Sequence, residues 1–306
     1  MSTHEVLVAL DFSDGSRAAL EQAAFIAKQT RAGLHALHVW QVPEFVPPNA
    51  RANDASTLAK AVETQARRDL DSFVFDARAS GIAIDQAFTE CGLPSAVIVE
   101  VAKRGAYELI VLGTHGRTGI AHALLGSVAE RVLRRAPCPV LVVRADAPKP
   151  RALRRILAPV DYSEGARRAL TCALDFSRSF GAEVEVVHVW DRPSYVSGDV
   201  IVHGPGENRR SLGELMRENA AREMQEFLGT VTRAAEAPRL SQRLLSGEPA
   251  STLIAELEKG EHDLVVLGTH GRSGFRRLLL GSTTEKLVRY SAVPVLVVPP
   301  LVPARE

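Results

Sequence analysis

The sequence predicts an α/β protein made of two tandem doubly wound domains, each built on a mainly parallel sheet. Three observations carry this prediction. Residues 6–40 align without a gap with residues 156–190, and both segments end in His-Val-Trp. Short, continuous apolar runs alternate with helix-like stretches, as is typical of strands buried on both faces of a parallel sheet. The length of 306 residues also suits two domains.

We expect the domains to span residues 1–145 and 152–306. The stretch at their junction, 144–152, is charged and contains proline, which suits a short exposed linker. Lys and Arg total 37 against 36 Asp and Glu, so the charge balance does not favour nucleic acid or an anionic membrane as a partner. No apolar run is long enough to span a bilayer. We therefore expect a cytoplasmic protein, in which Cys91, Cys138 and Cys172 stay reduced.

Each copy is expected to contain five strands. The first strand covers residues 6–10 and 156–160, and Pro159 suggests that the second copy's strand ends there. The second strand ends at the tryptophan, and the third covers residues 83–88 and 240–245. The fourth leads into a glycine-containing loop, and the fifth covers residues 139–143 and 294–298.

The helices are predicted from their start and stop signals. Ser13 and Ser163 are expected to cap the first helix of each copy, which a glycine ends near residue 33 or 181. Loops at 41–56 and 191–210 precede long helices at 56–79 and 211–235, and the second loop is a candidate flap over its site. A third helix follows Pro94 and Pro249. The fourth covers residues 127–135 and 282–290, with a serine cap.

A glycine motif follows the fourth strand in both copies. Gly113-Thr-His-Gly116 precedes Gly126-Ser127, and Gly268-Thr-His-Gly271 precedes Gly281-Ser282 at the same spacing. Glycine lets backbone N–H groups approach a ligand, and a helix start adds unpaired N–H groups and a positive dipole end. Such a combination suits a phosphate. The glycines can also be read as a turn and a helix cap, but the twofold occurrence favours a ligand.

An aspartate directly follows the first strand in each copy. In a doubly wound sheet, the carboxyl ends of the strands share the edge at which ligands bind, so Asp11 and Asp161 are candidate ligand contacts. Helix capping or ion pairing is the alternative. His115 and His270 lie inside the glycine loops as phosphate donors or as exposed side chains without a role. No cysteine or second histidine stands at metal-ligand spacing, so we expect no metal site built from protein groups alone.

These motifs resemble the universal stress protein family over essentially the whole chain, with the pattern G-x2-G-x9-G-S/T of its ATP-binding subclass. The resemblance implies an adenine nucleotide alpha hydrolase-like fold with strand order 3-2-1-4-5. It also implies domains that pair about a twofold axis through strand five, here as an internal pseudo-dimer with the option of a homodimer. Asp11 and Asp161 would hold the ribose or the adenine edge, and Val39 and Val189 would offer backbone groups to the adenine.

The resemblance further implies residues around the ribose and the phosphates. In the two copies these are Gly113, Gly116, Gly126 and Ser127, and Gly268, Gly271, Gly281 and Ser282. Neighbours with weaker claims are Thr114, Arg117, Val128, Thr269, Arg272 and Thr283; the arginines can equally be solvated surface groups. Val128 departs from the pattern because it lacks the hydroxyl that Thr283 supplies, which makes equal affinity at the two sites doubtful.

We expect an ATP-binding, regulatory stress-response module with two nucleotide sites per chain. Magnesium would arrive with the nucleotide, held mainly by its phosphates. One alternative is a slow ATP hydrolase or a nucleotide transferase. However, the Walker lysine is missing and no nucleophile–base pair stands out, so weak ATPase activity is the most we expect. The other alternative is a nucleotide-free dimerisation scaffold.

Overall fold

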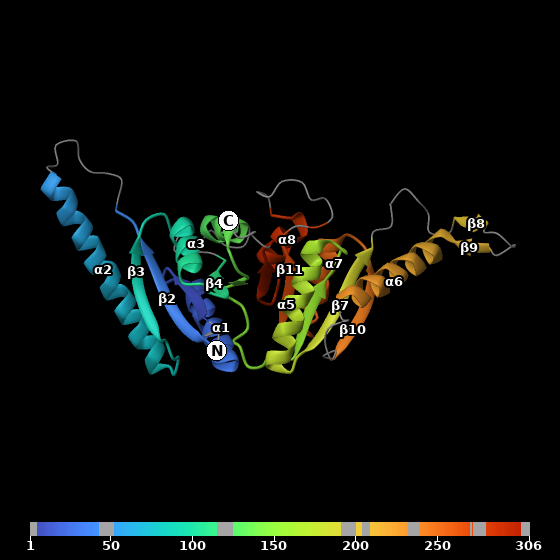
Figure 1. The fold of residues 1–306 in the computed structure, drawn as a ribbon, viewed down its shortest axis with the longest axis horizontal. Coiled ribbons are helices and arrows are strands. Elements are labelled where there is room, and N and C mark those ends of the chain that lie inside the picture. The colour runs from blue at the N-terminus through green and yellow to red at the C-terminus, as the bar shows by residue number, and fades with distance from the viewer. Residues whose placement is uncertain are drawn as a thin grey trace. The chain divides into compact units, whose positions relative to one another are not determined.

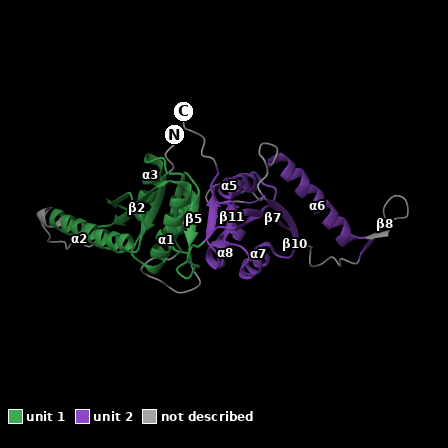
Figure 2. Ribbon diagram, turned by 90° about the horizontal axis from the view of Figure 1, so that it is seen from below, with its two compact units in different colours: residues 1–151, 301–306 green, residues 152–300 purple. Residues whose placement is uncertain are grey.

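The computed structural model describes residues 5–42, 52–114, 125–190, 200–203, 209–231, 239–269, 271 and 280–300. The chain divides between Arg151 and Ala152 into two compact units (Figure 2). This boundary falls within the charged stretch 144–152. None of the described helices combines the length and the apolar character that crossing a membrane requires.

The sheet of unit 1 has the strand order that the resemblance implied. Its strands, of which Figure 1 labels β2, β3 and β4, are β1 (Glu5–Leu10), β2 (Gly33–Trp40), β3 (Gln86–Cys91), β4 (Leu109–Gly113) and β5 (Val140–Val143). They lie in the order β3-β2-β1-β4-β5, and neighbouring strands run parallel. Leu7 pairs with His35 on one side and with Ile110 on the other, so β1 lies inside the sheet. Its continuous apolar run is explained by burial on both faces.

Unit 2 repeats this sheet. Its strands are β6 (Arg155–Pro159), β7 (Glu183–Trp190), β10 (Leu240–Ser246), β11 (Leu264–Gly268) and β12 (Val295–Val298), in the order β10-β7-β6-β11-β12. Pro159 is the last residue of β6, as predicted. The predicted loop 191–210 is partly wrong, because β8 (Ile201–His203) and β9 (Arg209–Ser211) form an antiparallel pair within and just beyond it. Residues 191–199 and 204–208 lie outside the described part of the chain, and so does the candidate flap they would form.

Four helices of the described part of each unit cover its sheet. In unit 1 they are α1 (Asp14–Thr30), α2 (Ala52–Ala79), α3 (Pro94–Arg104) and α4 (Ser127–Arg135). In unit 2 they are α5 (Glu164–Phe180), α6 (Leu212–Val231), α7 (Pro249–Glu258) and α8 (Ser282–Tyr290). Right-handed crossovers place the first two helices of each unit on one face of its sheet and the last two on the other. Accordingly, α3 packs on α4 and α7 packs on α8.

Two predicted boundaries in unit 1 are displaced. Strand β3 begins at Gln86, three residues later than predicted. At Asp85 it is the side chain that accepts the hydrogen bond from the Leu34 N–H, at 2.7 Å, so regular pairing with β2 begins only after this residue. Ile84 is buried but precedes the strand, which is why its apolar character was misleading. Helix α2 begins at Ala52, before the serine that the sequence suggested as its start.

The first helix of each unit ends in a left-handed residue, but only one of the two is glycine. Gly181 has φ 66° after α5, whereas Arg31 has φ 57° after α1. The prediction of a glycine stop near residue 33 is therefore wrong for unit 1, since Gly33 already belongs to β2. Its lack of a side chain instead makes room for the Glu5 carboxylate.

We expect Arg31→Gly to raise the free energy of unfolding by about 0.5–1 kcal/mol, because glycine adopts the left-handed conformation without a Cβ clash. Gly181→Arg, its counterpart in unit 2, should lower it by a similar amount. Equilibrium unfolding in urea measures both. Two variants as stable as the parent chain would show that this backbone position is not strained.

Candidate functional site

A cavity of about 410 Å³ opens at the carboxyl edge of the unit 1 sheet. It lies where β1 and β4 are neighbours and the strand order reverses, which is the place where doubly wound sheets bind ligands. We call it site one. Its lining includes Leu10, Asp11, Ser16, Val39, Gln41, Gly113, Thr114, Gly126, Ser127, Val128 and Ala129.

Unit 2 holds a matching cavity of about 350 Å³, site two. It lies at the carboxyl ends of β6 and β11. Its lining includes Val160, Asp161, His188, Val189, Gly268, Gly271, Gly281, Ser282, Thr283 and Thr284. Both volumes fall within the range of small-molecule sites.

The two cavities bring together most of the predicted site residues. Site one collects Asp11, Val39, Gly113, Thr114, Gly126, Ser127 and Val128, and site two collects Asp161, Val189, Gly268, Gly271, Gly281, Ser282 and Thr283. Thr269 does not line site two. It is buried, its N–H donates to Val298, and its carbonyl oxygen accepts from Gly281 at 2.8 Å. Gly116, Arg117 and Arg272 lie outside the described residues, as do both loop histidines.

Two helices that begin at these cavities, α4 and α8, have no side-chain cap. The predicted serine caps are wrong, because Gly126 precedes α4 and Gly281 precedes α8, while Ser127 and Ser282 are already the first helical residues. Neither glycine can offer a side-chain acceptor to the first turn. The serine caps predicted for the first helices are confirmed: Ser13 accepts from the Ser16 N–H, and Ser163 accepts from the Ala166 N–H. The first-turn N–H groups of α4 and α8 are thus left to whatever occupies the cavity.

Helix α7 is capped by a carboxylate of the chain itself, which binds the N–H groups of its first turn. Glu248 precedes the helix and accepts hydrogen bonds from the backbone N–H and the Oγ of Ser251, both at 2.8 Å. These hydrogen bonds, the backbone one first, lower the pKa of Glu248 to about 2. A negative charge is therefore stable at a helix start in this protein.

The aspartate of each site belongs to a tight turn. Asp11 Oδ1 accepts hydrogen bonds from the N–H of Ser13 at 3.1 Å and from its Oγ at 2.6 Å. Asp161 makes the same two contacts with Ser163. A local structural role and a role in ligand contact are compatible for these aspartates, because each carboxylate holds the turn and also lines its cavity.

The residue after each aspartate is an aromatic in the left-handed region. Phe12 has φ 67° and Tyr162 has φ 66°, which is uncommon for a bulky side chain. Both rings are held in place: Phe12 lies 4.4 Å from the His38 ring, and Tyr162 stacks on His188 at 4.3 Å. This ring packing fixes the turn that follows the first strand, and with it the position of the aspartate side chain.

Each of these histidines is fixed by its own strand neighbour. The Nδ1–H groups of His38 and His188 donate to the carbonyl oxygens of Leu10 and Val160, both at 2.7 Å. Sequence reasoning missed these two aromatic–histidine pairs. The available signal was the repeated Asp-aromatic-Ser segment followed at equal spacing by His-Val-Trp.

The glycines that line the cavities serve two different purposes. A Cβ on Gly113 would lie 2.7 Å from the carbonyl carbon of Gly15, and one on Gly268 would lie 3.0 Å from that of Gly165. These glycines therefore let the end of a strand approach the first turn of α1 or α5. Gly271 differs, because its Cβ would meet the Asp161 carboxylate at the edge of site two.

The chemistry of both cavities is that of backbone donors and hydroxyls. Their described lining residues include no Lys or Arg, and each cavity has one carboxylate. Nowhere in the described residues do three His, Cys, Asp or Glu side chains come together as a metal site. An anion bound here would be held by helix N–H groups and by Ser127, or by Ser282 and Thr283.

Comparison with known proteins identifies relatives of both units. The model of the universal stress protein family matches residues 3–144 and 152–299. A universal stress protein of Mycobacterium tuberculosis is 31% identical over 207 residues, which are 67% of this chain and 65% of that protein. One from Mycolicibacterium smegmatis is 27% identical over 302 residues, covering 96% of this chain and 97% of its own.

A solved structure extends the comparison to the fold. The crystal structure of a universal stress protein from Archaeoglobus fulgidus matches with a TM-score of 0.70 at 23% identity. The match covers 98% of this chain and 99% of that one. It shows the same fold over the whole length of both chains.

Proposed function

Because the chain belongs to the universal stress protein family, we propose that it binds ATP at two sites, one in each unit, and acts as a regulatory stress-response module. One observation carries the proposal: two helices without a side-chain cap, α4 and α8, begin at equivalent cavities on the ligand-binding edge of their sheets. Elsewhere in the same units, Ser13, Ser163 and Glu248 cap the starts of α1, α5 and α7 from within the chain, whereas α3 also begins without a side-chain cap.

The cavity walls divide into parts that suit the parts of a nucleotide. The first turns of α4 and α8 would hold the phosphates through backbone N–H groups. Asp11 and Asp161, fixed by their serine contacts, would accept hydrogen bonds from ribose hydroxyls. Val39 and Val189, near the ends of β2 and β7, would face the adenine. Magnesium would be carried on the phosphates and would neutralise part of their charge.

The two sites should differ in affinity. Thr283 adds a hydroxyl at the start of α8, where Val128 has an apolar side chain at the start of α4. A hydrogen bond to a charged group contributes about 1.5–3 kcal/mol. Site two should therefore bind ATP at least about tenfold more tightly than site one.

Equilibrium dialysis with radiolabelled ATP and magnesium tests the proposal on protein freed of carried-over ligand. We expect two ATP molecules to bind per chain. The tighter of the two binding events should be the one that is lost when site two is disabled by Ser282→Asp. We also expect the chain to hydrolyse bound ATP and release ADP more slowly than about 1 per second, which is below the turnover of typical enzymes. No binding at millimolar ATP would overturn the proposal, and faster turnover would replace it with the hydrolase alternative.

A further inference from the structure

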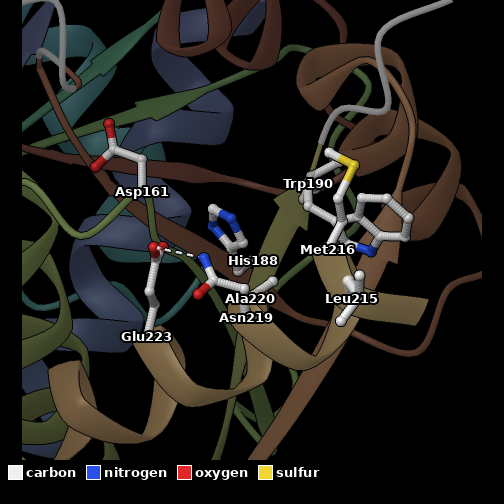
Figure 3. Close-up of a pocket in the computed structure, with 9 residues that line it drawn as sticks. Asp161, His188, Trp190, Leu215, Met216, Asn219, Ala220 and Glu223 are labelled. Atoms are coloured by element: carbon white, nitrogen blue, oxygen red, sulfur yellow. Dashed lines mark hydrogen bonds between the residues drawn. The ribbon is translucent and has the colours of Figure 1, made fainter. Parts of the chain in front are cut away.

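Two larger hollows formed by described residues have no assigned role. Figure 3 shows the one beside α6, where Met216 and Leu215 lie next to the Trp190 indole. It shares Asp161 and His188 with site two, so it belongs to the surroundings of that site. The other measures about 790 Å³, and its described lining shares no residue with either nucleotide site. It lies in unit 1 and is formed by residues within 21–34, 80–85 and 149–150; we call it the α1 hollow.

The α1 hollow combines apolar side chains with charged ones. Ala24, Ile82 and Pro150 line it and are half-buried. Lys28 and Arg31, at the end of α1, also line it and are exposed. A ligand in this hollow would therefore meet apolar surface and positive charge together.

The charges that line the α1 hollow do not cancel. Lys149 is neutralised by Glu21, whose carboxylate lies 3.1 Å from its ammonium group. Asp85 accepts a hydrogen bond from a backbone N–H at 2.7 Å and keeps its negative charge. The side chains of Lys28 and Arg31 form no hydrogen bond or ion pair within the described part of the chain. Two unpaired cations thus stand against one carboxylate in the described lining, which favours an anion over a cation.

Unit 2 has the same helix end without this charge. Arg178 is the counterpart of Lys28, and Asp175 pairs with it at 2.7 Å. Gly181 takes the place of Arg31 after the helix. A basic side chain in the last turn stabilises a helix in either unit, so Lys28 alone does not indicate a ligand. Arg31 is the feature that stability does not explain.

Arg31 stands at a position where its own backbone is strained. Its φ is 57°, in the left-handed region that is unfavourable for a residue with a Cβ, and unit 2 has a glycine with φ 66° at the same place. Strained residues of this kind cluster at functional positions, where the side chain offsets the strain. The arginine side chain, directed by this turn, is therefore a candidate ligand contact.

We propose that the α1 hollow binds a small organic acid, a carboxylate with an apolar body. The carboxylate lies between the ammonium group of Lys28 and the guanidinium group of Arg31, whose parallel N–H groups match its two oxygens. The apolar body covers Ala24, Ile82 and Pro150, and its removal from water adds to the affinity.

Calorimetric titration of the nucleotide-free chain with 2-naphthoate tests the proposal. We expect saturable binding, and the cationic counterpart 2-naphthylmethylamine should bind at least about fivefold more weakly. Lys28→Gln and Arg31→Gln should each weaken naphthoate binding about fivefold, because each removes one exposed charge contact. Arg178→Gln, the matched change in unit 2, should leave the affinity unchanged.

Arg31→Gly separates the ligand contact from the backbone strain. It should weaken naphthoate binding as Arg31→Gln does, while it raises the stability of the free chain in urea. Arg31→Gln keeps a Cβ in the left-handed region and should leave that stability unchanged. A damaged fold would lower affinity and stability together. Site one does not enter this comparison, because Ser16, which lines it, lies about 20 Å from Arg31 along α1.

The proposal fails if naphthoate does not saturate up to about 10 mM, if the amine binds as tightly, or if Arg31→Gln keeps the parent affinity. Because the titration contains no nucleotide, its outcome is independent of whether ATP binds to either site.

Discussion

A carboxylate placed at the start of α8 is expected to stabilise the free protein and to abolish ATP binding at site two. The change is Ser282→Asp, at the first residue of a helix whose preceding glycine has no side chain to cap it. An acid in the first turn meets the unpaired N–H groups and the positive end of the helix dipole. It would occupy the place that we assign to phosphate oxygens.

The two effects differ in sign and in size. Stability should rise by about 0.3–1 kcal/mol, as for other acids at helix starts. Two unit charges 4 Å apart repel by about 4 kcal/mol at an effective dielectric constant of 20. Since a nucleotide carries several negative charges at this end, its affinity should fall at least about hundredfold. Binding and stability thus move in opposite directions, which a damaged fold would not produce.

Dialysis and urea unfolding of the same samples measure the two effects. ATP binding should fall from two per chain to one in Ser282→Asp, and Ser127→Asp should remove the other site. Ser282→Asn is the matched neutral control and should retain two. Full binding by Ser282→Asp would mean that the start of α8 does not hold the phosphates.

Gly113→Ala is expected to destabilise unit 1 by about 2–3 kcal/mol, at the upper end of the cost of overpacking. The new Cβ would lie 2.7 Å from the carbonyl carbon of Gly15, 2.9 Å from its oxygen and 3.1 Å from the N atom of Ser16. All three are backbone atoms in the first turn of α1, so no side chain can rotate away. Either β4 or the whole helix must shift.

Two other glycines calibrate this effect. Gly268→Ala in unit 2 should cost less, about 1–2 kcal/mol, because its shortest contacts are 3.0 Å. Gly229→Ala, within α6, should instead raise stability by about 0.5–1 kcal/mol, since its Cβ would have no described atom within 4 Å beyond its chain neighbours and the backbone of its own helix. Urea unfolding compares the three, and dialysis follows ATP. A Gly113→Ala chain that keeps its stability and loses a nucleotide would return this glycine to the ligand role that its motif suggested.

The sequence was sufficient for features that are local or repeated. The apolar runs, the serine caps of α1 and α5 and the glycine spacing are each contained in a few neighbouring residues. Because each of these features occurs in both halves of the chain, chance is a poor explanation for it. The family resemblance then supplied the strand order, which the alternation of strands and helices alone left open.

Features made by residues far apart in the chain were not predictable. In unit 1, His35 binds Glu5 at 3.1 Å and the Tyr107 hydroxyl at 2.7 Å. In unit 2, the aligned residues are Glu185, Arg155 and His262, and the carboxylate now sits in the middle, 2.7 Å from His262 and 3.3 Å from Arg155. Each set pairs its charged and polar groups in its own way, and only the assembled sheet shows that the two sets occupy equivalent places.

The mistaken serine caps and the role of Gly113 have a related cause. A serine next to a glycine at a helix start is a good cap in isolation, and a one-residue shift of the helix moves the cap to the glycine. Similarly, a glycine needed for packing against α1 and one needed beside a ligand look alike in sequence. Only the backbone contacts of Gly15 and Gly165 distinguish them.

The central claim is that the first turns of α4 and α8 hold the phosphates of a nucleotide. A crystal structure of the chain grown with ATP and magnesium measures this directly. We predict phosphate oxygens within hydrogen-bonding distance of backbone N–H groups of residues 127–129 and 282–284, with Asp11 and Asp161 at the riboses. Cavities that remain vacant at saturating ATP, or phosphates bound away from both helix starts, would contradict the account.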